Sequence, residues 1–164
     1  MIVIRDYVES DADALWSIFF NTIRNINRRD YTQAQVEAWA PDLVDSDYWL
    51  KRMNGLSPFV AEIDGVIVGY TDLQSDGLID HFYCHHEYQG KGVGGALMNH
   101  VLALGNSRGV ARYYSEVSIT ARPFYEHLGF SVVQEKVVDL SGQKLRYFLM
   151  EKIPDNGRTD LQGL

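Results

Sequence analysis

The pattern of apolar and polar residues divides the first third of the chain into one strand and three helices. Apolar and polar side chains alternate over residues 2–7, which predicts a strand, and a helical period then predicts a helix over 10–26. Thr32 opens a capping box, so a short second helix is expected to begin there and to stop before Pro41. Residues 45–53 predict a third short helix.

The middle of the chain has the pattern of an antiparallel meander. Strand patterns over 59–63 and 66–73 flank an Asp-Gly pair, which is typical of a two-residue hairpin turn. A second turn at 75–77 then leads into an apolar strand over 78–84.

The remaining elements complete an α+β domain. They are a helix over 92–107 that ends near Gly109, a strand over 110–117, a helix over 122–128, and a closing hairpin over 130–138 and 145–152 that turns around Ser141-Gly142. This order predicts a mixed, mostly antiparallel sheet of about seven strands with helices on both faces. We expect one domain over residues 1–153 and a flexible tail over 154–164.

Glycines are concentrated between the strand over 78–84 and the helix that follows. They remove Cβ atoms where backbone amides would have to approach a ligand, and unpaired N–H groups meet at a helix start. These glycines are Gly90, Gly92, Gly94 and Gly95. Such a helix start attracts anions, so a phosphate or pyrophosphate is the expected ligand, with Lys91 adding charge at the rim. The alternative is a tight glycine turn that binds nothing.

Two familiar phosphate loops fit this stretch poorly. The loop of nucleoside triphosphatases ends in G-K-S/T, whereas Lys91 is followed by Gly92. The Rossmann fingerprint G-x-G-x-x-G matches formally, and Glu116 lies at a suitable distance for a ribose contact. However, polar residues 85–89 separate the glycines from their strand, and too few residues follow Glu116 for the remaining strands of a dinucleotide domain.

A third pattern, Q/R-x-x-G-x-G/A, is met by Gln89, Gly92 and Gly94 just after a strand. This stretch resembles the coenzyme A pyrophosphate loop of the GNAT superfamily of acetyl-CoA-dependent N-acetyltransferases. A later stretch, S-x-x-A-x-x-F-Y-x-x-x-G-F from Ser118 to Phe130, is similar to a second motif of the family, which has Asn in place of Ser118. Within the superfamily, the chain is similar to small bacterial members whose acceptors are mostly unassigned.

The resemblance extends from residue 2 to about residue 151 and implies a fold in which two strands splay apart around the pantetheine arm of the cofactor. It implies that backbone groups of Phe82 and Cys84 bind the pantetheine and that amides of 89–95 hold the pyrophosphate. The expected cofactor-binding residues are Phe82, Tyr83, Cys84, Gln89, Gly90, Lys91, Gly92, Val93, Gly94, Gly95 and Ser118. The Cys84 side chain is expected to be a small buried apolar group rather than a nucleophile.

The resemblance also suggests catalytic residues. Tyr125 stands at the family position for the donor to the departing thiolate, and a phenol with a pKa of about 10 stays neutral at physiological pH. The amine must lose a proton, and the candidate bases are Asp80, expected on one strand face with Phe82, and Glu116 on the facing strand. The alternatives are an Asp80 ion pair with a neighbouring arginine and a packing role for Tyr125.

Composition limits the partners. A formal net charge of −7 and a pI near 5.1 argue against a nucleic-acid or anionic-membrane surface and modestly favour a cationic acceptor. The N-terminus lacks a signal pattern and no apolar run reaches membrane length, so a cytoplasmic location is expected. The single cysteine excludes an intrachain disulfide, and the histidine spacing predicts no metal site.

We therefore expect transfer of an acetyl group from acetyl-CoA to a small-molecule or peptide amine by direct attack in a ternary complex. A non-catalytic acyl-CoA-binding regulatory domain and a nicotinamide-binding domain are the alternatives. The resemblance makes residues 25–31, with Asn27, Arg28 and Arg29, the expected acceptor-side lid. Five aromatic residues are expected to pack in the core: Trp16, Phe20, Tyr31, Trp39 and Trp49. The identity of the acceptor, the acyl chain length and a homodimer stay open.

Overall fold

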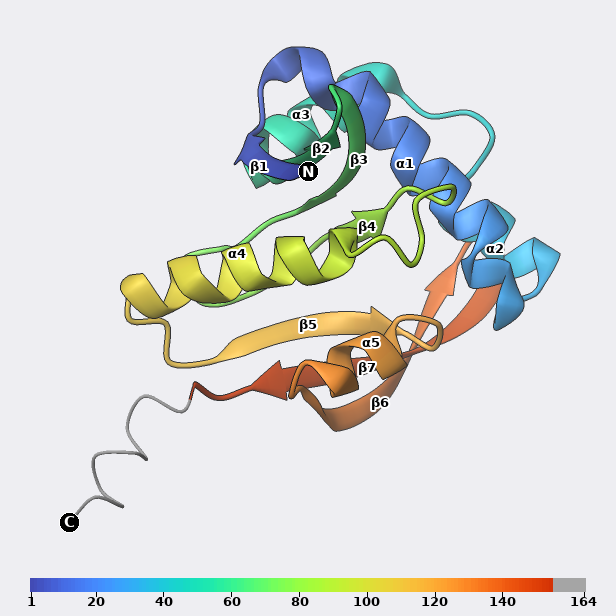
Figure 1. Ribbon diagram of the computed structural model, residues 1–164. Coiled ribbons are helices and arrows are strands. Elements are labelled where there is room, and N and C mark those ends of the chain that lie inside the picture. Colours follow the sequence, from blue (N-terminus) through green and yellow to red (C-terminus); the bar gives the residue numbers. More distant parts are fainter. Residues whose placement is uncertain (155–164) are drawn as a thin grey trace.

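The computed structural model describes residues 1–154, which form two β-sheets with helices packed on them (Figure 1). The first sheet has the order β1-β2-β3-β4 and the second β5-β7-β6, and the paired strands run antiparallel. The strands are β1 (Ile2–Asp6), β2 (Phe59–Ile63), β3 (Val66–Thr71), β4 (Phe82–Cys84), β5 (Tyr113–Ser118), β6 (Ser131–Leu140) and β7 (Gln143–Lys152). The helices are α1 (Ala12–Asn25), α2 (Gln33–Trp39), α3 (Ser46–Leu56), α4 (Val93–Ser107) and α5 (Arg122–His127), with 3-10 turns η1 (Glu9–Asp11) and η2 (Asn27–Arg29). The expected α+β fold is confirmed.

Both hairpins turn at the predicted dipeptides. Asp64 and Gly65 have φ of 51° and 79°, and Ser141 and Gly142 have φ of 49° and 82°. Two consecutive positive φ angles match the right-handed twist of the flanking strands. These turns therefore fix the register of β2 with β3 and of β6 with β7.

Helices α1 and α4 cover opposite faces of the first sheet. Val60 packs with residues of α1, whereas the next residue, Ala61, packs with α4, as the alternation of a strand requires. Helix α4 lies closest to the sheet at Gly69, where a Cβ atom would lie 2.9 Å from Cγ1 of Val93. This close contact positions the start of α4 beside β4.

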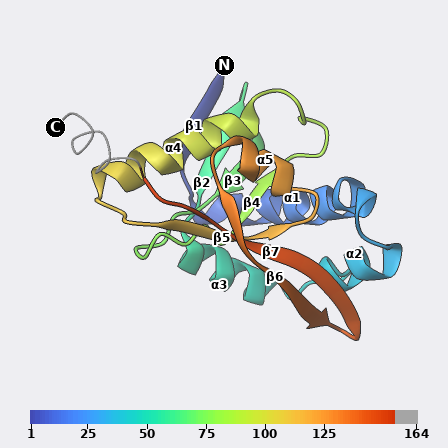
Figure 2. The same cartoon turned by 90° about the horizontal axis from the view of Figure 1, so that it is seen from below.

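The second sheet also has two distinct faces. Tyr113 and Val117 of β5 pack in a core with Phe148 of β7 and residues of α4 and α5. The alternate residues of β5, beginning with Tyr114, point to the other face. The long β6–β7 hairpin projects from the body of the molecule on the side of α2 (Figure 2). Among the described helices, none combines the length and apolar character that crossing a membrane requires.

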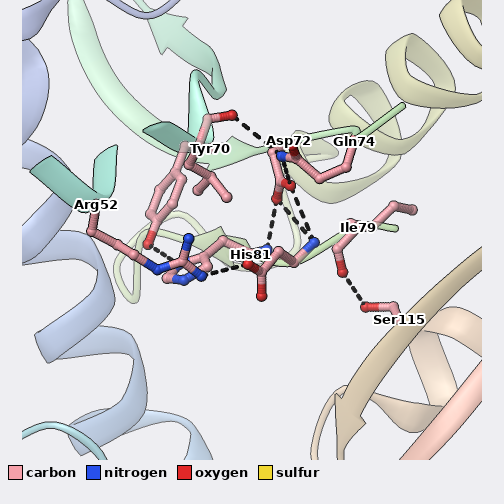
Figure 3. Close-up of polar contacts among 9 residues, drawn as sticks. Arg52, Tyr70, Asp72, Gln74, Ile79, His81 and Ser115 are labelled. Atoms are coloured by element: carbon pink, nitrogen blue, oxygen red, sulfur yellow. Dashed lines mark hydrogen bonds and ion pairs between the residues drawn. The ribbon is translucent and has the colours of Figure 1, made fainter. Parts of the chain in front are cut away.

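The strand expected over 78–84 is shorter than predicted. The buried Asp72 carboxylate accepts hydrogen bonds from the amides of Asp80 and His81, the latter at 2.7 Å (Figure 3). These bonds draw the chain out of the ladder, so Asp80 belongs to no strand and does not share a strand face with Phe82 as expected. Regular pairing with β3 begins only at Phe82.

The interrupted segment also connects the two sheets. The Ile79 amide donates to the Tyr114 carbonyl at 2.9 Å, and Leu78 forms a parallel bridge with Tyr114. The chain therefore pairs with β5 around residue 79 and with β3 after residue 81. Between these two pairings β4 separates from β5, which is the splay that the family resemblance implied. Of the tail expected over 154–164, residues 155–164 lie outside the described residues.

Candidate functional site

A cavity of about 390 Å³ opens where β4 and β5 diverge. The cavity is lined by the start of α4, by Phe124 and Tyr125 of α5, and by residues of α1 and η2. Ten of the eleven residues expected to bind the cofactor line it. The exception is Lys91 in the loop, whose ammonium lies 5.6 Å from the centre of the Tyr88 ring.

The first turn of α4 presents bare backbone amides to this cavity. Gly92 caps the helix with a φ of 84°, a conformation that side chains rarely adopt, and Gly90 before it has a φ of 73°. The amides of 93–95 have no acceptor within the helix, since the first helical bond runs from Ala96 to Gly92. A Cβ on Gly94 would lie 3.0 Å from the Phe124 ring. The helix start thus suits a phosphate group.

Gln89 holds the loop that precedes α4. Its Nε2 donates to the carbonyl oxygens of Cys84 and His85, at 3.0 Å and 3.3 Å. These bonds fold the loop back onto the end of β4, so the glutamine of the Q-x-x-G-x-G pattern acts on the backbone of the loop.

The free edge of β4 faces the cavity. The His85 amide donates to the Val68 carbonyl, so alternation turns the backbone groups of Phe82 and Cys84 away from β3. The Cys84 carbonyl accepts a 2.8 Å bond from Thr22 Oγ1 of α1. Burial raises the pKa of the Cys84 thiol to about 12, so the thiol stays protonated, as expected for a packing residue.

Tyr125 is buried and lines the cavity. Its ring packs against Phe82 and Phe130, with centroids 5.9 Å and 5.0 Å away. Its hydroxyl lies 3.4 Å from Ser115 Oγ, which itself donates to the Ile79 carbonyl at 2.7 Å. Burial raises the pKa of the Tyr125 hydroxyl, so the phenol is neutral and able to donate a proton or hydrogen bond.

The two candidate carboxylates have different surroundings. Asp80 forms an ion pair with Arg52 of α3, which is the alternative considered from the sequence. Glu116 is more open, with 58% of its side chain exposed, and Lys136 Nζ lies 3.7 Å from it. His81, next to Asp80, is packed among aromatic rings, and burial lowers the pKa of its imidazole to about 4. That imidazole is neutral at physiological pH.

A second cavity of about 380 Å³ lies on the outer face of the β5-β7-β6 sheet. It shares five lining residues with the first cavity: Trp39, Asp80, Tyr83, Glu116 and Ser118. The two cavities therefore meet beside both candidate carboxylates. The sequence prediction missed this second cavity, although apolar residues on both faces of β7 are a signal for it.

The expected lid lies across the junction of the two cavities. Asn27 and Arg29 line the first cavity and Tyr31 lines the second, whereas Arg28 lines neither. The Tyr31 hydroxyl donates to the Arg146 carbonyl at 2.5 Å and accepts a bond from the amide of residue 119. Trp39, expected only in the core, packs on Tyr31 and lines both cavities.

Ser118 connects this segment to the start of α5. Its hydroxyl accepts hydrogen bonds from the Ala121 amide at 3.0 Å and from Asn27 Nδ2 at 3.2 Å. The serine thus makes local bonds at the position where the family motif has asparagine. Within residues 1–154, no group of histidine, cysteine or acidic side chains is arranged to hold a metal ion.

Known proteins share this architecture. The family model described as an acetyltransferase (GNAT) domain matches residues 27–153. An uncharacterized N-acetyltransferase of Escherichia coli, YafP, is 28% identical to this chain, over 94% of this chain and 98% of the length of YafP. A GCN5-related N-acetyltransferase from Rhodopseudomonas palustris is 30% identical, covers 93% of this chain and 95% of its own, and superposes with a TM-score of 0.88. The PaiA N-acetyltransferase from Thermoplasma acidophilum, solved with coenzyme A, is 20% identical over 94% of this chain and 99% of its own, with a TM-score of 0.71.

Proposed function

The chain belongs to the GNAT acetyltransferase family, and we propose that it transfers the acetyl group of acetyl-CoA directly to an amine in a ternary complex. The observation that carries this proposal is the junction of two cavities at the splay of β4 and β5. The first cavity is lined by the start of α4, and the second lies on the outer face of the β5-β7-β6 sheet. Asp80 and Glu116 line both cavities, and Tyr125 lines the first.

The residues of the first cavity suit coenzyme A. The amides of 93–95 offer hydrogen-bond donors and the positive end of a helix dipole to the pyrophosphate. The free edge of β4 offers the backbone groups of Phe82 and the amide of Cys84 to the amide-rich pantetheine arm, since the Cys84 carbonyl already accepts bonds from Thr22 and Gln89. The PaiA structure, which has the same fold and contains coenzyme A, supports this assignment.

The chemistry requires an acid and a base. Acetyl-CoA supplies a thioester: the amine nitrogen bonds to its carbonyl carbon, the carbon–sulfur bond breaks, and coenzyme A leaves as a thiolate that takes up a proton. Tyr125 is the proposed proton donor, because its hydroxyl is buried and neutral and the residue lines the cavity. Glu116 is the better placed of the two bases to accept the proton of the amine, since Asp80 is held by Arg52.

Direct attack is favoured over an acetylated enzyme. The one thiol of the chain belongs to Cys84, and burial keeps it protonated at physiological pH. A protonated thiol is a poor nucleophile. The amine must therefore reach the thioester itself, which agrees with the open junction of the two cavities.

A screen of amines with acetyl-CoA, read by release of free coenzyme A thiol, tests the proposal. The Gly92→Glu variant is the control, because it places bulk and negative charge at the helix start and should abolish the thermal stabilisation by acetyl-CoA. A non-catalytic acyl-CoA-binding domain would be stabilised by acetyl-CoA yet release no thiol with any amine. Stabilisation that survives in Gly92→Glu would contradict the assignment of the cofactor site.

A further inference from the structure

The second cavity has a composition that selects among amines. Eleven of its fifteen lining residues are apolar or aromatic, and its volume of about 380 Å³ is that of a small-molecule site. From this cavity we infer that the acceptor is a small primary amine carried on an aromatic or branched aliphatic group, with no carboxylate beside the nitrogen. This inference rests on the proposed acetyl transfer and names the class of its acceptor.

Seven of the eleven apolar or aromatic lining residues belong to the protein cores or pack against them, but the rest of the apolar lining is not explained by core packing. Leu78, Tyr147 and Leu149 line the cavity but belong to none of the three apolar cores found among the described residues. Leu149 pairs with Glu116 across β5 and β7, so an apolar wall lies directly beside the candidate base. An apolar ligand in the cavity would remove the exposed apolar area of Leu78, Tyr147 and Leu149 from water.

The charges around the cavity disfavour an amino acid as acceptor. Among the described residues, the one cation that lines this cavity is Arg146, which pairs with Glu135 at 2.5 Å. The lining carboxylates Asp80 and Glu116 face Arg52 and, at 3.7 Å, Lys136. A substrate carboxylate inside this cavity would therefore approach two carboxylates and a cation that is already paired, while Arg29 lines only the first cavity. An incoming ammonium can donate a hydrogen bond to Glu116, because Lys136 is too distant to form one and the carboxylate keeps acceptor positions free.

Matched amines test the inference in the wild-type protein. Phenethylamine carries the apolar group, ethylamine lacks it, and phenylalanine adds a carboxylate to it. Values of kcat/KM are compared for the unprotonated amines at saturating acetyl-CoA, so that differences in amine pKa do not enter. We expect phenethylamine to exceed ethylamine by about 100-fold or more and phenylalanine by about 10-fold or more. Equal values for phenethylamine and ethylamine, or a preference for phenylalanine, would overturn the inference.

A pair of variants locates the effect in the cavity. Leu149→Asn keeps the approximate size of the side chain but removes its apolar character, and should lower kcat/KM for phenethylamine about 10-fold more than kcat/KM for ethylamine. Val137→Asn makes the same kind of change at a 58% exposed position of β6 that lines neither cavity, and should change neither value. The ratio of the two amines within each variant does not depend on how much of the protein is folded. An unchanged ratio in Leu149→Asn would contradict the assignment.

Binding separates failure of this inference from failure of the proposed function. Calorimetry of phenethylamine added to the protein saturated with coenzyme A should show binding that Leu149→Asn weakens. If no amine releases coenzyme A yet phenethylamine binds in this way, acetyl transfer fails while the cavity assignment stands. If polar amines are acetylated and phenethylamine does not bind, only the inference fails. Faster acetylation of peptides with an N-terminal phenylalanine than of phenethylamine would also overturn it in favour of a peptide acceptor.

Discussion

Replacement of Tyr125 by phenylalanine separates the chemical role of its hydroxyl from the packing role of its ring. Ser115 Oγ, at 3.4 Å, is the one polar partner of this hydroxyl among residues 1–154, and the distance is at the long end of hydrogen bonding. Loss of so weak a bond should lower the free energy of unfolding by no more than about 1 kcal/mol. The ring contacts with Phe82 and Phe130 remain. Cofactor affinity should therefore persist.

The expected loss of activity is much larger than this loss of stability. General acid catalysis typically contributes about 100-fold to 10,000-fold, which corresponds to roughly 3–5 kcal/mol of transition-state stabilisation. We expect kcat of Tyr125→Phe to fall by at least about tenfold, with the KM for acetyl-CoA nearly unchanged. The assay is single-turnover release of coenzyme A thiol, in which chemistry rather than product release is observed.

Tyr113→Phe is a matched control in the same core. The Tyr113 hydroxyl donates to the Leu102 carbonyl at 3.0 Å and to Asn106 Oδ1 at 2.9 Å, and it does not line the cavity. Its removal should cost about 1–2 kcal/mol of stability but leave kcat intact. A Tyr125→Phe rate within twofold of wild type, or an equal loss in Tyr113→Phe, would refute the acid role and make Tyr125 a packing residue.

Three further predictions follow from buried contacts and charges. Gly105→Ala should destabilise the protein by about 1–3 kcal/mol in urea unfolding despite the better helix propensity of alanine, because the added Cβ would lie 2.3 Å from the buried Tyr113 hydroxyl. Burial raises the pKa of Asp72 from 3.8 to about 6. The favourable contribution of Asp72 to stability is therefore fully present below about pH 4 and is lost as pH rises through about 6. The free energy of unfolding of Asp72→Asn, measured in urea relative to wild type, should rise by on the order of 3 kcal/mol between pH 4 and pH 7. Glu116→Gln should alter the pH dependence of kcat/KM more than Asp80→Asn, and unchanged profiles in both would mean that the amine loses its proton to water.

Local signals in the sequence predicted the parts of the fold that local chemistry determines. The Asp64-Gly65 and Ser141-Gly142 turns occupy the positive-φ conformations that these pairs favour. The helix that follows the glycine loop likewise has Gly92 as its N-cap, so it begins within one residue of the predicted start. Such features depend on a few adjacent residues, so a single sequence suffices to locate them.

Contacts between distant residues explain what the sequence did not predict. The strand over 78–84 was expected to be continuous because its residues are apolar, but the carboxylate of Asp72 binds amides eight and nine residues later in the chain. An ion pair of Asp80 with an arginine was considered from the sequence, but its partner was not identified, because Arg52 lies 28 positions away. The second cavity was missed for a different reason. Leu149 was read only as part of a strand. Apolar residues on both faces of β7 nevertheless indicate that its outer face is also shielded from water by other groups.

The same contacts explain why the splay and the candidate acid coincide. Ser115 donates to the Ile79 carbonyl from the core face of β5, while the Ile79 amide binds the next carbonyl of β5, at Tyr114. Together with the bond from the Tyr114 amide to the Gly77 carbonyl, they hold residues 77–79 against β5, and the Asp72 carboxylate binds the amides of the next two residues. The gap between β4 and β5 must therefore begin beside Ser115, and Tyr125 reaches that point through the same hydroxyl. A thioester that follows the free edge of β4 to the narrow end of the gap would meet Tyr125 on one side and the junction with the apolar cavity on the other.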